Sequence, residues 1–473
     1  MCGIVGAIAQ RNVVPILMEG LRRLEYRGYD SAGIAIRNGA ANLQRIRSVG
    51  KVAELQSLLD RSTVDGPLGI AHTRWATHGM PAERNAHPHM SGEDVAIVHN
   101  GIIENHSELR ADLQQQGYTF SSETDTEVIA HLLAALLREG QSTCDATRNA
   151  IKRLVGAYAL AVINPDDPDR MVVARAGSPL VIGVGEGEHF IASDVFALLP
   201  VTQRFIFLEE GDLAEIRRDG ISIFDAQGQA VEREVRTSEL SASNAEKGPY
   251  RHYMLKEIFE QPAVIAETLE GRIHKGRLLE QSFGHVAQEL FDRTRAVQII
   301  ACGTSYHAGM VARYWLEEVG IPCQIEVASE FRYRHAVVQP DTLFVTISQS
   351  GETADTLAAL RSAKQAAYIG SLVVCNVPES SLVRESDVAL MTRAGPEIGV
   401  ASTKAFTTQL VALRLLTLAL AKRRGLSIEQ EAEWVEELQA LPRQVEVVLE
   451  LSDAIKEMAE SFAEMQNALF LGR

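Results

Sequence analysis

A cysteine directly follows the initiator methionine. If Met1 is removed, Cys2 carries a thiol and a free α-amine in one residue. An α-amino group titrates at about 7.7 to 8.0, so it can take the thiol proton directly or through a water. A buried structural cysteine is the alternative, and for an isolated Met-Cys it is the more common case. The pattern permits nucleophilic catalysis at Cys2 and needs partner groups to support it.

Two segments offer such groups. In GIAHTRWATHG, Arg74 follows an apolar run, and its planar guanidinium could clamp a carboxylate. In VHNGIIENH, a strand is expected to end at Asn100 and Gly101, which provide a side-chain amide and an unobstructed backbone N–H. Such a pair of donors suits an oxyanion hole. Thr77 and His78 lie close to Arg74 in the sequence.

Asp125 could hold a substrate ammonium from the start of a helix. Apolar residues after SSETDTEV follow helical spacing, at Ile129, Leu132, Leu133, Leu136 and Leu137. Thr124 and Glu127 have the spacing of a capping box, which predicts Asp125 in the first turn. Each group also has a structural interpretation: Asp125 as a partner of the helix dipole, Arg74 as a surface ion pair and Asn100-Gly101 as a turn.

The segments MCGIVGAI, LEYRGYDSAGIA, HTRWATHG, HNGIIENH and SETDTE follow one another over 130 residues. This run resembles the glutaminase domain of the class II (N-terminal nucleophile) amidotransferases. The resemblance implies that Cys2 attacks the glutamine side-chain amide, releases ammonia and forms a glutamyl thioester that water hydrolyses. It further implies Asn100 and Gly101 as oxyanion donors, Arg74 on the glutamine α-carboxylate, Asp125 on its α-amino group, Thr77 and His78 as further contacts, and Arg27 as support for the nucleophile.

Four histidines, at 72, 78, 87 and 89, could suggest a metal site in the same region. However, the spacing supplies no helical His-x-x-x-His pair and no cysteine partners. We therefore expect neither a metal nor a cofactor.

A second set of candidate groups lies in two loops after apolar strands. In IIACGTSYHAG and VTISQSGETADT, Ser305, Ser348, Ser350 and Thr353 precede or begin helices. Backbone N–H groups and hydroxyls in such loops are aimed at a phosphate. Helix caps are the alternative for a single loop. Neither loop matches a nucleotide-binding or dinucleotide-binding glycine pattern, so nucleotides are less suitable ligands.

SQSGET, with the upstream CGTS and the downstream EIGVASTKAFTTQ, resembles the sugar isomerase (SIS) module. Together the two modules resemble the amidotransferase family that makes glucosamine 6-phosphate and glutamate from fructose 6-phosphate and glutamine. By this resemblance Thr304, Ser305, Ser348, Gln349, Ser350 and Thr353 hold the sugar phosphate, and Val400 and Ser402 contact the sugar. The family has a second SIS module and a tail with a Schiff-base lysine, which do not follow here, so we expect the chain to be incomplete. Lys404 could replace that lysine, but an exposed or structural role is the better interpretation.

Composition agrees with a soluble globular protein of two or three domains, because 46% of the 473 residues are apolar and 23% are charged. The net charge of -16 disfavours nucleic acid and anionic membranes. The most apolar helix carries Arg414, so no membrane span is predicted. Five scattered cysteines fit a reducing cytoplasm. We also expect a homodimer.

Strand and helix patterns predict an α/β multidomain protein. Short β-rich runs with few helices up to about residue 235 indicate a layered α+β domain. The resemblance implies that this is the αββα glutaminase domain, at 2–240. A polar composition indicates a linker at about 236–250. We assign 241–296 to the linker and a helical lead-in. Alternating strands and helices then predict a doubly wound parallel-sheet SIS domain at 297–424. The start of a second SIS domain is expected at 425–473, ending in a strand at NALFLGR.

Three other functions compete with the synthase. If the second SIS module is missing from the working molecule, the chain could be a glutaminase that binds sugar phosphate without converting it. A phosphosugar sensor is another possibility, although no helix presents a basic face to DNA. A phosphoribosyltransferase or an asparagine synthetase with the same glutaminase is disfavoured by SQSGET and by the lack of a nucleotide loop.

Overall fold

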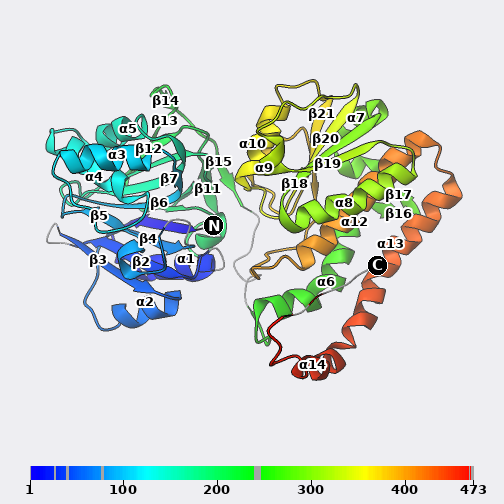
Figure 1. Ribbon diagram of the computed structural model, residues 1–473, viewed down its shortest axis with the longest axis horizontal. Coiled ribbons are helices and arrows are strands. Elements are labelled where there is room, and N and C mark those ends of the chain that lie inside the picture. Colours follow the sequence, from blue (N-terminus) through cyan, green and yellow to red (C-terminus); the bar gives the residue numbers. More distant parts are fainter. Residues whose placement is uncertain are drawn as a thin grey trace. The chain divides into compact units, whose positions relative to one another are not determined.

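The computed structural model describes residues 2–25, 28–38, 42–75, 79–238, 247–467 and 469 (Figure 1). The chain divides into two compact units, Met1–Ser243 and Asn244–Arg473. Each unit has its own sheets and its own hydrophobic core.

The first unit contains two antiparallel sheets. The eight-stranded sheet has the order β15-β11-β9-β10-β1-β4-β2-β3, and the seven-stranded sheet has the order β14-β13-β12-β8-β7-β6-β5. The strands of the larger sheet are β1 (Gly3–Ile8), β2 (Ser31–Arg37), β3 (Leu43–Val49), β4 (Leu68–Arg74), β9 (Val181–Val184), β10 (His189–Ala192), β11 (Arg204–Phe207) and β15 (Val235–Thr237). Those of the smaller sheet are β5 (His89–Ser91), β6 (Val95–Ile103), β7 (Gly156–Ile163), β8 (Met171–Ala176), β12 (Leu213–Ile216), β13 (Ile221–Phe224) and β14 (Ala230–Val231).

Helices cover the outer faces of both sheets. One core lies between the sheets and receives Ile4 from β1 and Val98 from β6. A second core packs the opposite face of β6, through Ile97, against α3 (His106–Gln115), α4 (Glu127–Arg138) and α5 (Thr143–Ile151). The larger sheet is covered by α1 (Val14–Leu24) and α2 (Val52–Leu59). The predicted αββα layering is therefore confirmed.

Three details of the sequence interpretation were wrong. The run RFIFLEEGDLAEI, expected as one of the short β-rich runs before residue 235, forms two strands, β11 and β12, in different sheets, because the chain turns at Gly211 with φ +85°. Residues 236–237 of the predicted linker extend β15, which pairs with β11. The expected capping box is absent, since α4 begins at Glu127 and the Thr124 hydroxyl contacts His89 Nε2 at 3.1 Å instead.

The second unit is built on a parallel sheet with the order β19-β18-β20-β21-β22. Its strands are β18 (Ala296–Ala301), β19 (Cys323–Val327), β20 (Thr342–Ser348), β21 (Gly370–Cys375) and β22 (Val388–Met391). Alternate residues of the central strands enter two different cores, so Val345 packs on one face and Phe344 on the other. This arrangement confirms the predicted doubly wound sheet.

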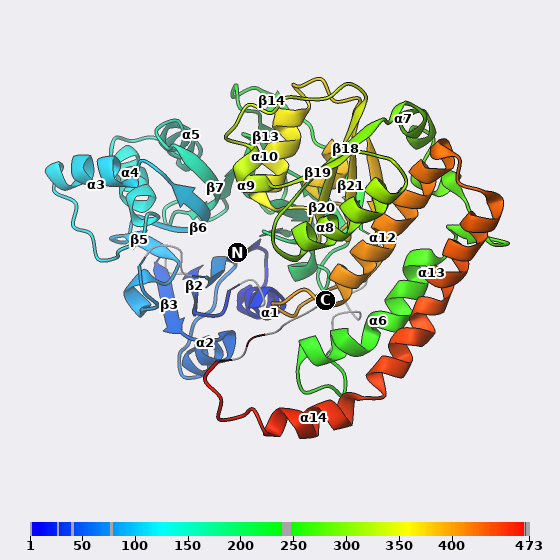
Figure 2. The same cartoon turned by 45° about the vertical axis from the view of Figure 1, so that its right-hand side comes forward.

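Different helices cover the two faces of the parallel sheet (Figure 2). One face packs against α8 (Gly303–Glu318) and α12 (Lys404–Ala421). The helices α6 (Tyr253–Leu269) and α7 (Ala287–Arg293) contact α12 and share the same core, and α13 (Ile428–Leu449) packs on α6. The other face packs against α9 (Ala328–Phe331), α10 (Ala354–Ala363) and α11 (Ser381–Glu385). A small hairpin, β16 (Ile273–His274) with β17 (Arg277–Leu278), and the helix α14 (Ser452–Glu460) complete the α-helices and β-strands of the described residues.

The region from 404 to 460 is mainly helical and contains α12, α13 and α14. Residues Lys404–Arg424 are long and apolar enough to cross a membrane, but 78% of that window is buried inside the structure. This burial is typical of a core helix, and α12 packs against α6 and α8. Most of the expected last strand, NALFLGR, lies outside the described residues.

Candidate functional site

Strand alternation directs the candidate residues of the first unit into the gap between its two sheets. In β4, Leu68 and Ile70 belong to the core between the sheets, so Arg74 continues the same face. In β6, Ala96 and Val98 belong to that core, and Asn100 follows them at the same spacing. Ile4 and Ile8 of β1 also face this core, which gives Cys2, two residues before Ile4, the same direction.

Contacts with Trp75 and Asn100 hold Cys2 in this gap. The Trp75 backbone N–H donates to Cys2 Sγ at 3.2 Å, and Asn100 Nδ2 donates to the Cys2 carbonyl oxygen at 2.9 Å. Burial raises the pKa of the Cys2 thiol above its ordinary value of 9.0, although the Trp75 N–H and the charge of Arg74 act in the opposite direction. The thiol therefore needs a base to become a nucleophile at neutral pH.

Asn100 and Gly101 lie within a strand, not in a turn. They belong to β6, which continues to Ile103, and they are opposite Ala159 and Tyr158 of β7. Gly101 has φ +133°, and a Cβ at this position would overlap the carbonyl oxygen of Ala157. Only glycine fits this backbone. The conformation of Gly101 therefore fixes the peptide bond between Asn100 and Gly101.

Arg74 is buried and is therefore not a surface ion pair. Its side chain is 4% exposed, and its guanidinium lies 3.9 Å from Asp30 and donates to the Gly79 carbonyl at 3.2 Å. Asp125 precedes α4 and does not lie in its first turn, and its carboxylate accepts the Ile103 N–H at 2.9 Å. This bond ties Asp125 to β6 two residues beyond Gly101. Arg27, Thr77 and His78, the other residues predicted in this site, lie outside the described residues.

A group of buried histidines adjoins the site. The ring centroids of His72 and His87 are 4.1 Å apart, and those of His87 and His89 are 4.8 Å apart. Burial lowers the pKa of His72 and of His89 to about 3, so both imidazoles are neutral. Among the described residues, no three His, Cys, Asp or Glu side chains are grouped as metal ligands. The sequence interpretation considered these histidines only as metal ligands, although the alternation in β4 already gave His72 the same face as Arg74.

The candidate sugar-phosphate residues of the second unit meet at one edge of the parallel sheet. The strand order places β18 beside β20. From β18 the chain continues to β19 at one edge of the sheet, and from β20 it continues to β21 towards the other edge. Ligands of doubly wound folds bind at such a switch point, outside the carboxyl ends of the strands. Thr304 and Ser305 open α8 after β18, and Ser348 ends β20.

The loop after β20 is held by its own side chains. Ser348 Oγ accepts the Gly351 N–H at 3.0 Å and lies 3.3 Å from Thr353 Oγ1. Ser350 Oγ accepts the Glu352 N–H at 3.2 Å. These bonds gather hydroxyls and backbone donors ahead of α10, as a phosphate site requires. Gln349 lies in the same loop and is half-buried.

A third loop carries Val400 and Ser402. Val400 is 64% exposed, and Ser402 Oγ donates to Glu397 at 3.0 Å. The Glu397 carboxylate also accepts the N–H groups of Thr403 and Ala405, at 2.9 and 3.0 Å, and so satisfies the start of α12.

Lys404 has a structural role. Its side chain is 4% exposed and its ammonium lies 2.7 Å from the Glu260 carboxylate. The exposed alternative for this lysine is wrong, and its ion pair with Glu260 occupies the side-chain nitrogen that a Schiff base would require.

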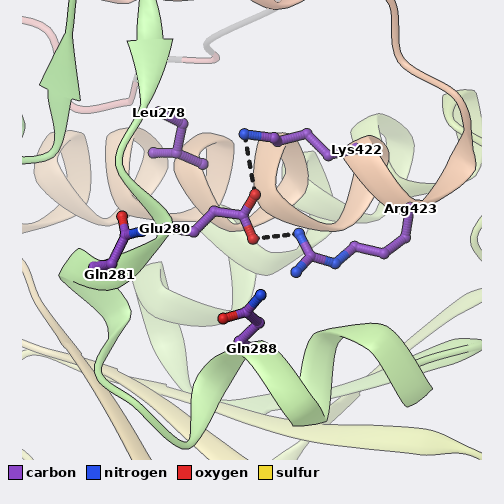
Figure 3. A pocket seen from close by; sticks show the side chains of 6 residues that line it. All are labelled: Leu278, Glu280, Gln281, Gln288, Lys422 and Arg423. Carbon is purple, nitrogen blue, oxygen red and sulfur yellow. Dashed lines mark hydrogen bonds and ion pairs between the residues drawn. The ribbon is translucent and has the colours of Figure 1, made fainter.

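A separate polar pocket of about 380 Å³ is lined by Leu278, Glu280, Gln281, Gln288, Lys422 and Arg423 (Figure 3). Both cations of this pocket already have a carboxylate partner, since Lys422 lies 3.0 Å from Glu280 and Arg423 also pairs with Glu280. At 1.5 Å per residue, the 18 residues of α12 separate this pocket from Lys404 by roughly 27 Å. It is therefore distinct from the candidate sugar-phosphate site.

The comparisons with known proteins cover both units. Residues 72–200 match the family described as glutamine amidotransferase domain, and residues 290–419 match the SIS domain family. Proteins named glutamine–fructose-6-phosphate aminotransferase (isomerizing) from Pseudomonas putida and Shewanella oneidensis are 62% and 59% identical to the chain. Both alignments cover 100% of this chain and 78% of the relative.

Solved structures are similar to parts of the chain. The C-terminal domain of glucosamine-fructose-6-phosphate aminotransferase from Francisella tularensis is 52% identical, with a TM-score of 0.48, over 48% of this chain and 65% of that chain. A glutamine phosphoribosylpyrophosphate amidotransferase from B. subtilis is 19% identical, with a TM-score of 0.44, over 79% of this chain and 81% of that chain.

Proposed function

Because this chain belongs to the family of isomerizing glutamine–fructose-6-phosphate aminotransferases, we propose that its two candidate sites carry the two halves of one synthesis. The chain is an enzyme that makes glucosamine 6-phosphate and glutamate from fructose 6-phosphate and glutamine. The relatives' names favour this function over a glutaminase that only binds sugar phosphate, or over a sensor. The observation that carries the assignment of sites is the contact of Cys2 with Asn100 in the gap between the sheets.

In the glutamine half, Cys2 is the proposed nucleophile. After Met1 is removed, the free α-amine of Cys2 takes the proton of the thiol. A base is needed because burial favours the protonated thiol. The sulfur then forms a bond to the amide carbon of glutamine, and the carbonyl oxygen becomes an oxyanion. Collapse of this intermediate breaks the C–N bond, and the transferred proton leaves with ammonia. Water hydrolyses the resulting thioester to glutamate and restores the thiol.

Asn100 Nδ2 and the Gly101 N–H are the proposed oxyanion donors. The Asn100 amide has two hydrogens, of which one is used by the Cys2 carbonyl, so the second can bind the oxyanion. The Arg74 guanidinium is suited to the glutamine α-carboxylate, and the Asp125 carboxylate to its α-ammonium. Arg27, Thr77 and His78 are proposed as further glutamine contacts or supports.

In the sugar half, the loops after β18 and β20 are the proposed phosphate cradle. Thr304, Ser305, Ser348, Gln349, Ser350 and Thr353 supply hydroxyl, amide and backbone donors. Val400 and Ser402 are proposed to contact the sugar from the loop that Glu397 holds. The ammonia released at Cys2 becomes the amino group of glucosamine 6-phosphate.

The proposal is tested by assaying the full chain and Cys2→Ala for glutamate and for glucosamine 6-phosphate, after the N-terminal residue has been identified by intact mass. We expect equimolar products from the unmodified sequence and neither product from Cys2→Ala with glutamine as nitrogen donor. Ser348→Ala should raise the KM for fructose 6-phosphate and leave glutamine hydrolysis in the absence of sugar unchanged. Hydrolysis by Cys2→Ala would disprove the role of the nucleophile.

We further propose the limits 2–240 for the glutaminase domain and 297–424 for the SIS domain, joined through 241–296. A cytoplasmic homodimer is part of the same proposal, and light scattering of the purified chain tests it. A monomer at micromolar concentration would contradict it.

A further inference from the structure

His72 connects the two sheets beside the proposed oxyanion donor. It lies in β4 of the eight-stranded sheet, and its Nε2 is 3.0 Å from Asn100 Oδ1 in β6 of the seven-stranded sheet. The same nitrogen is 3.2 Å from the His99 carbonyl oxygen. His72 is fully buried. We infer that His72 is a positioning residue that fixes the orientation of the Asn100 amide for the oxyanion. This inference rests on the proposed function of the glutamine site.

The contacts determine which ring nitrogen carries the proton. Asn100 Nδ2 donates to the Cys2 carbonyl, so the opposite side of the amide, facing His72, is the acceptor oxygen. Since the His99 carbonyl is also an acceptor, Nε2 of His72 must be the N–H donor to both. Nδ1 has no hydrogen-bond partner among the described residues. A proton on Nδ1 would be a buried, unsatisfied donor, so His72 is the neutral Nε2–H tautomer.

This tautomer excludes the flipped amide. In a flipped Asn100, the Nδ2 hydrogens would face the Nε2–H of His72, and Oδ1 would face the Cys2 carbonyl oxygen. Both contacts would be repulsive, donor against donor and acceptor against acceptor. A flipped amide would also present an oxygen to the developing oxyanion. His72 therefore keeps the hydrogens of Asn100 on the side of Cys2 without touching the substrate itself.

The experiment is a double-mutant cycle in the full chain with His72→Leu, Asn100→Ala and the two combined. We expect His72→Leu to lower kcat for glutamine hydrolysis by roughly 10²-fold, which is the effect of losing one oxyanion donor. The KM for glutamine should change by less than about threefold, because the amide acts mainly in the transition state. In the Asn100→Ala background, His72→Leu should have little further effect. His72→Gln, which keeps an N–H donor near the position of Nε2, should recover most of the rate.

A second readout separates orientation of the amide from damage to the nucleophile. Iodoacetamide alkylates Cys2 without an oxyanion, so its rate should be equal in His72→Leu and in the unmodified sequence. The control is His189→Leu, which removes another buried histidine in the same sheet, opposite Ile8 at the far end of β1. This control should leave kcat unchanged. An additive cycle, or an unchanged kcat in His72→Leu, would overturn the inference.

If His72→Leu does not fold, nitrogen NMR of the unmodified chain decides the question. We expect the His72 ring as the neutral Nε2–H tautomer from pH 8 down to pH 5, and an Nδ1–H tautomer or a cation would refute the role. Failure of the proposed function is recognised separately, because Cys2→Ala would then still hydrolyse glutamine.

Discussion

The backbone N–H of Trp75 points at the sulfur of Cys2 across 3.2 Å, from the end of a different strand. The peptide bond between Arg74 and Trp75, which carries this N–H, lies in close contact with Gly28. A Cβ on Gly28 would lie 2.6 Å from the Arg74 carbonyl carbon and 3.0 Å from the Trp75 nitrogen. The missing side chain of Gly28 thus provides the space that the Trp75 donor occupies.

Gly28→Ala is therefore expected to displace the Trp75 N–H and to raise the pKa of the Cys2 thiol further, because this donor stabilises the thiolate. The pH dependence of Cys2 alkylation by iodoacetamide measures this pKa, and its midpoint should move upward. Hydrolysis of glutamine at pH 7.5 should fall by about tenfold. Gly220→Ala is the control, since a Cβ on Gly220 meets nothing within 4 Å. Equal midpoints in the two variants would contradict the prediction.

Gly101→Ala should abolish most glutamine hydrolysis. The added Cβ would collide with the Ala157 carbonyl oxygen, so the Gly101 peptide, the second proposed oxyanion donor, must move. We expect kcat to fall by roughly 10² to 10³-fold. Gly92→Ala is the control, because Gly92 also has a positive φ of +57° but an added Cβ there meets no atom. It therefore measures the cost of positive φ without a collision. That control should keep full activity with a loss of about 1 kcal/mol in the free energy of unfolding. A fully active Gly101→Ala would exclude this peptide as a donor.

Glu397→Gln should weaken the sugar site. The carboxylate accepts N–H groups of Thr403 and Ala405 and the hydroxyl of Ser402, and an amide replaces one of its two acceptor oxygens by a donor. The loop with Val400 should then shift, and the KM for fructose 6-phosphate should rise about tenfold. Basal glutamine hydrolysis serves as the internal reference and should stay constant. Glu429→Gln, an exposed acid in the first turn of α13, should change neither value.

Acid should destabilise the first unit through its buried histidines. The pKa of His72 and of His89 is about 3 in the folded protein because burial disfavours the cation, against an ordinary value of 6.5. The unfolded chain therefore binds more protons below pH 6.5, and stability is lost as the pH falls from 6.5 towards 3. The loss amounts to roughly 2 kcal/mol per histidine at pH 5.

Urea unfolding at pH 7 and pH 5 measures this loss in a background with Trp315→Phe and Trp434→Phe, which leaves Trp75 as the reporter of the first unit. His89→Gln should show a smaller difference between the two pH values than the background. A pH-independent unfolding free energy in the background chain would show that these histidines are not buried in the neutral form.

The glutamine site was predicted from residue types and from the resemblance of five ordered segments to a known family, and periodicity adds which way some of these residues point. Alternation in a strand fixes which side chains share a face, so the segments around Cys2, Arg74 and Asn100 already had the correct directions. The order of strands, loops and helices after residue 296 likewise predicted the doubly wound sheet, with Ser305 and Ser348 at neighbouring strand ends. Boundaries were less accurate at Thr124, where a contact with His89 replaced the expected cap.

Other features depend on which segments meet in space, and one sequence does not encode that in a local pattern. His72 and Asn100 belong to different sheets, and only the packing of those sheets brings Nε2 within 3.0 Å of the amide oxygen. Lys404 became a buried ion pair because Glu260 of α6 packs beside the start of α12. The sequence by itself determined which chemical groups are available and which way each points along its strand or loop. The tertiary structure decided which partner each group meets, because burial and pairing arise from contacts between residues far apart in the chain.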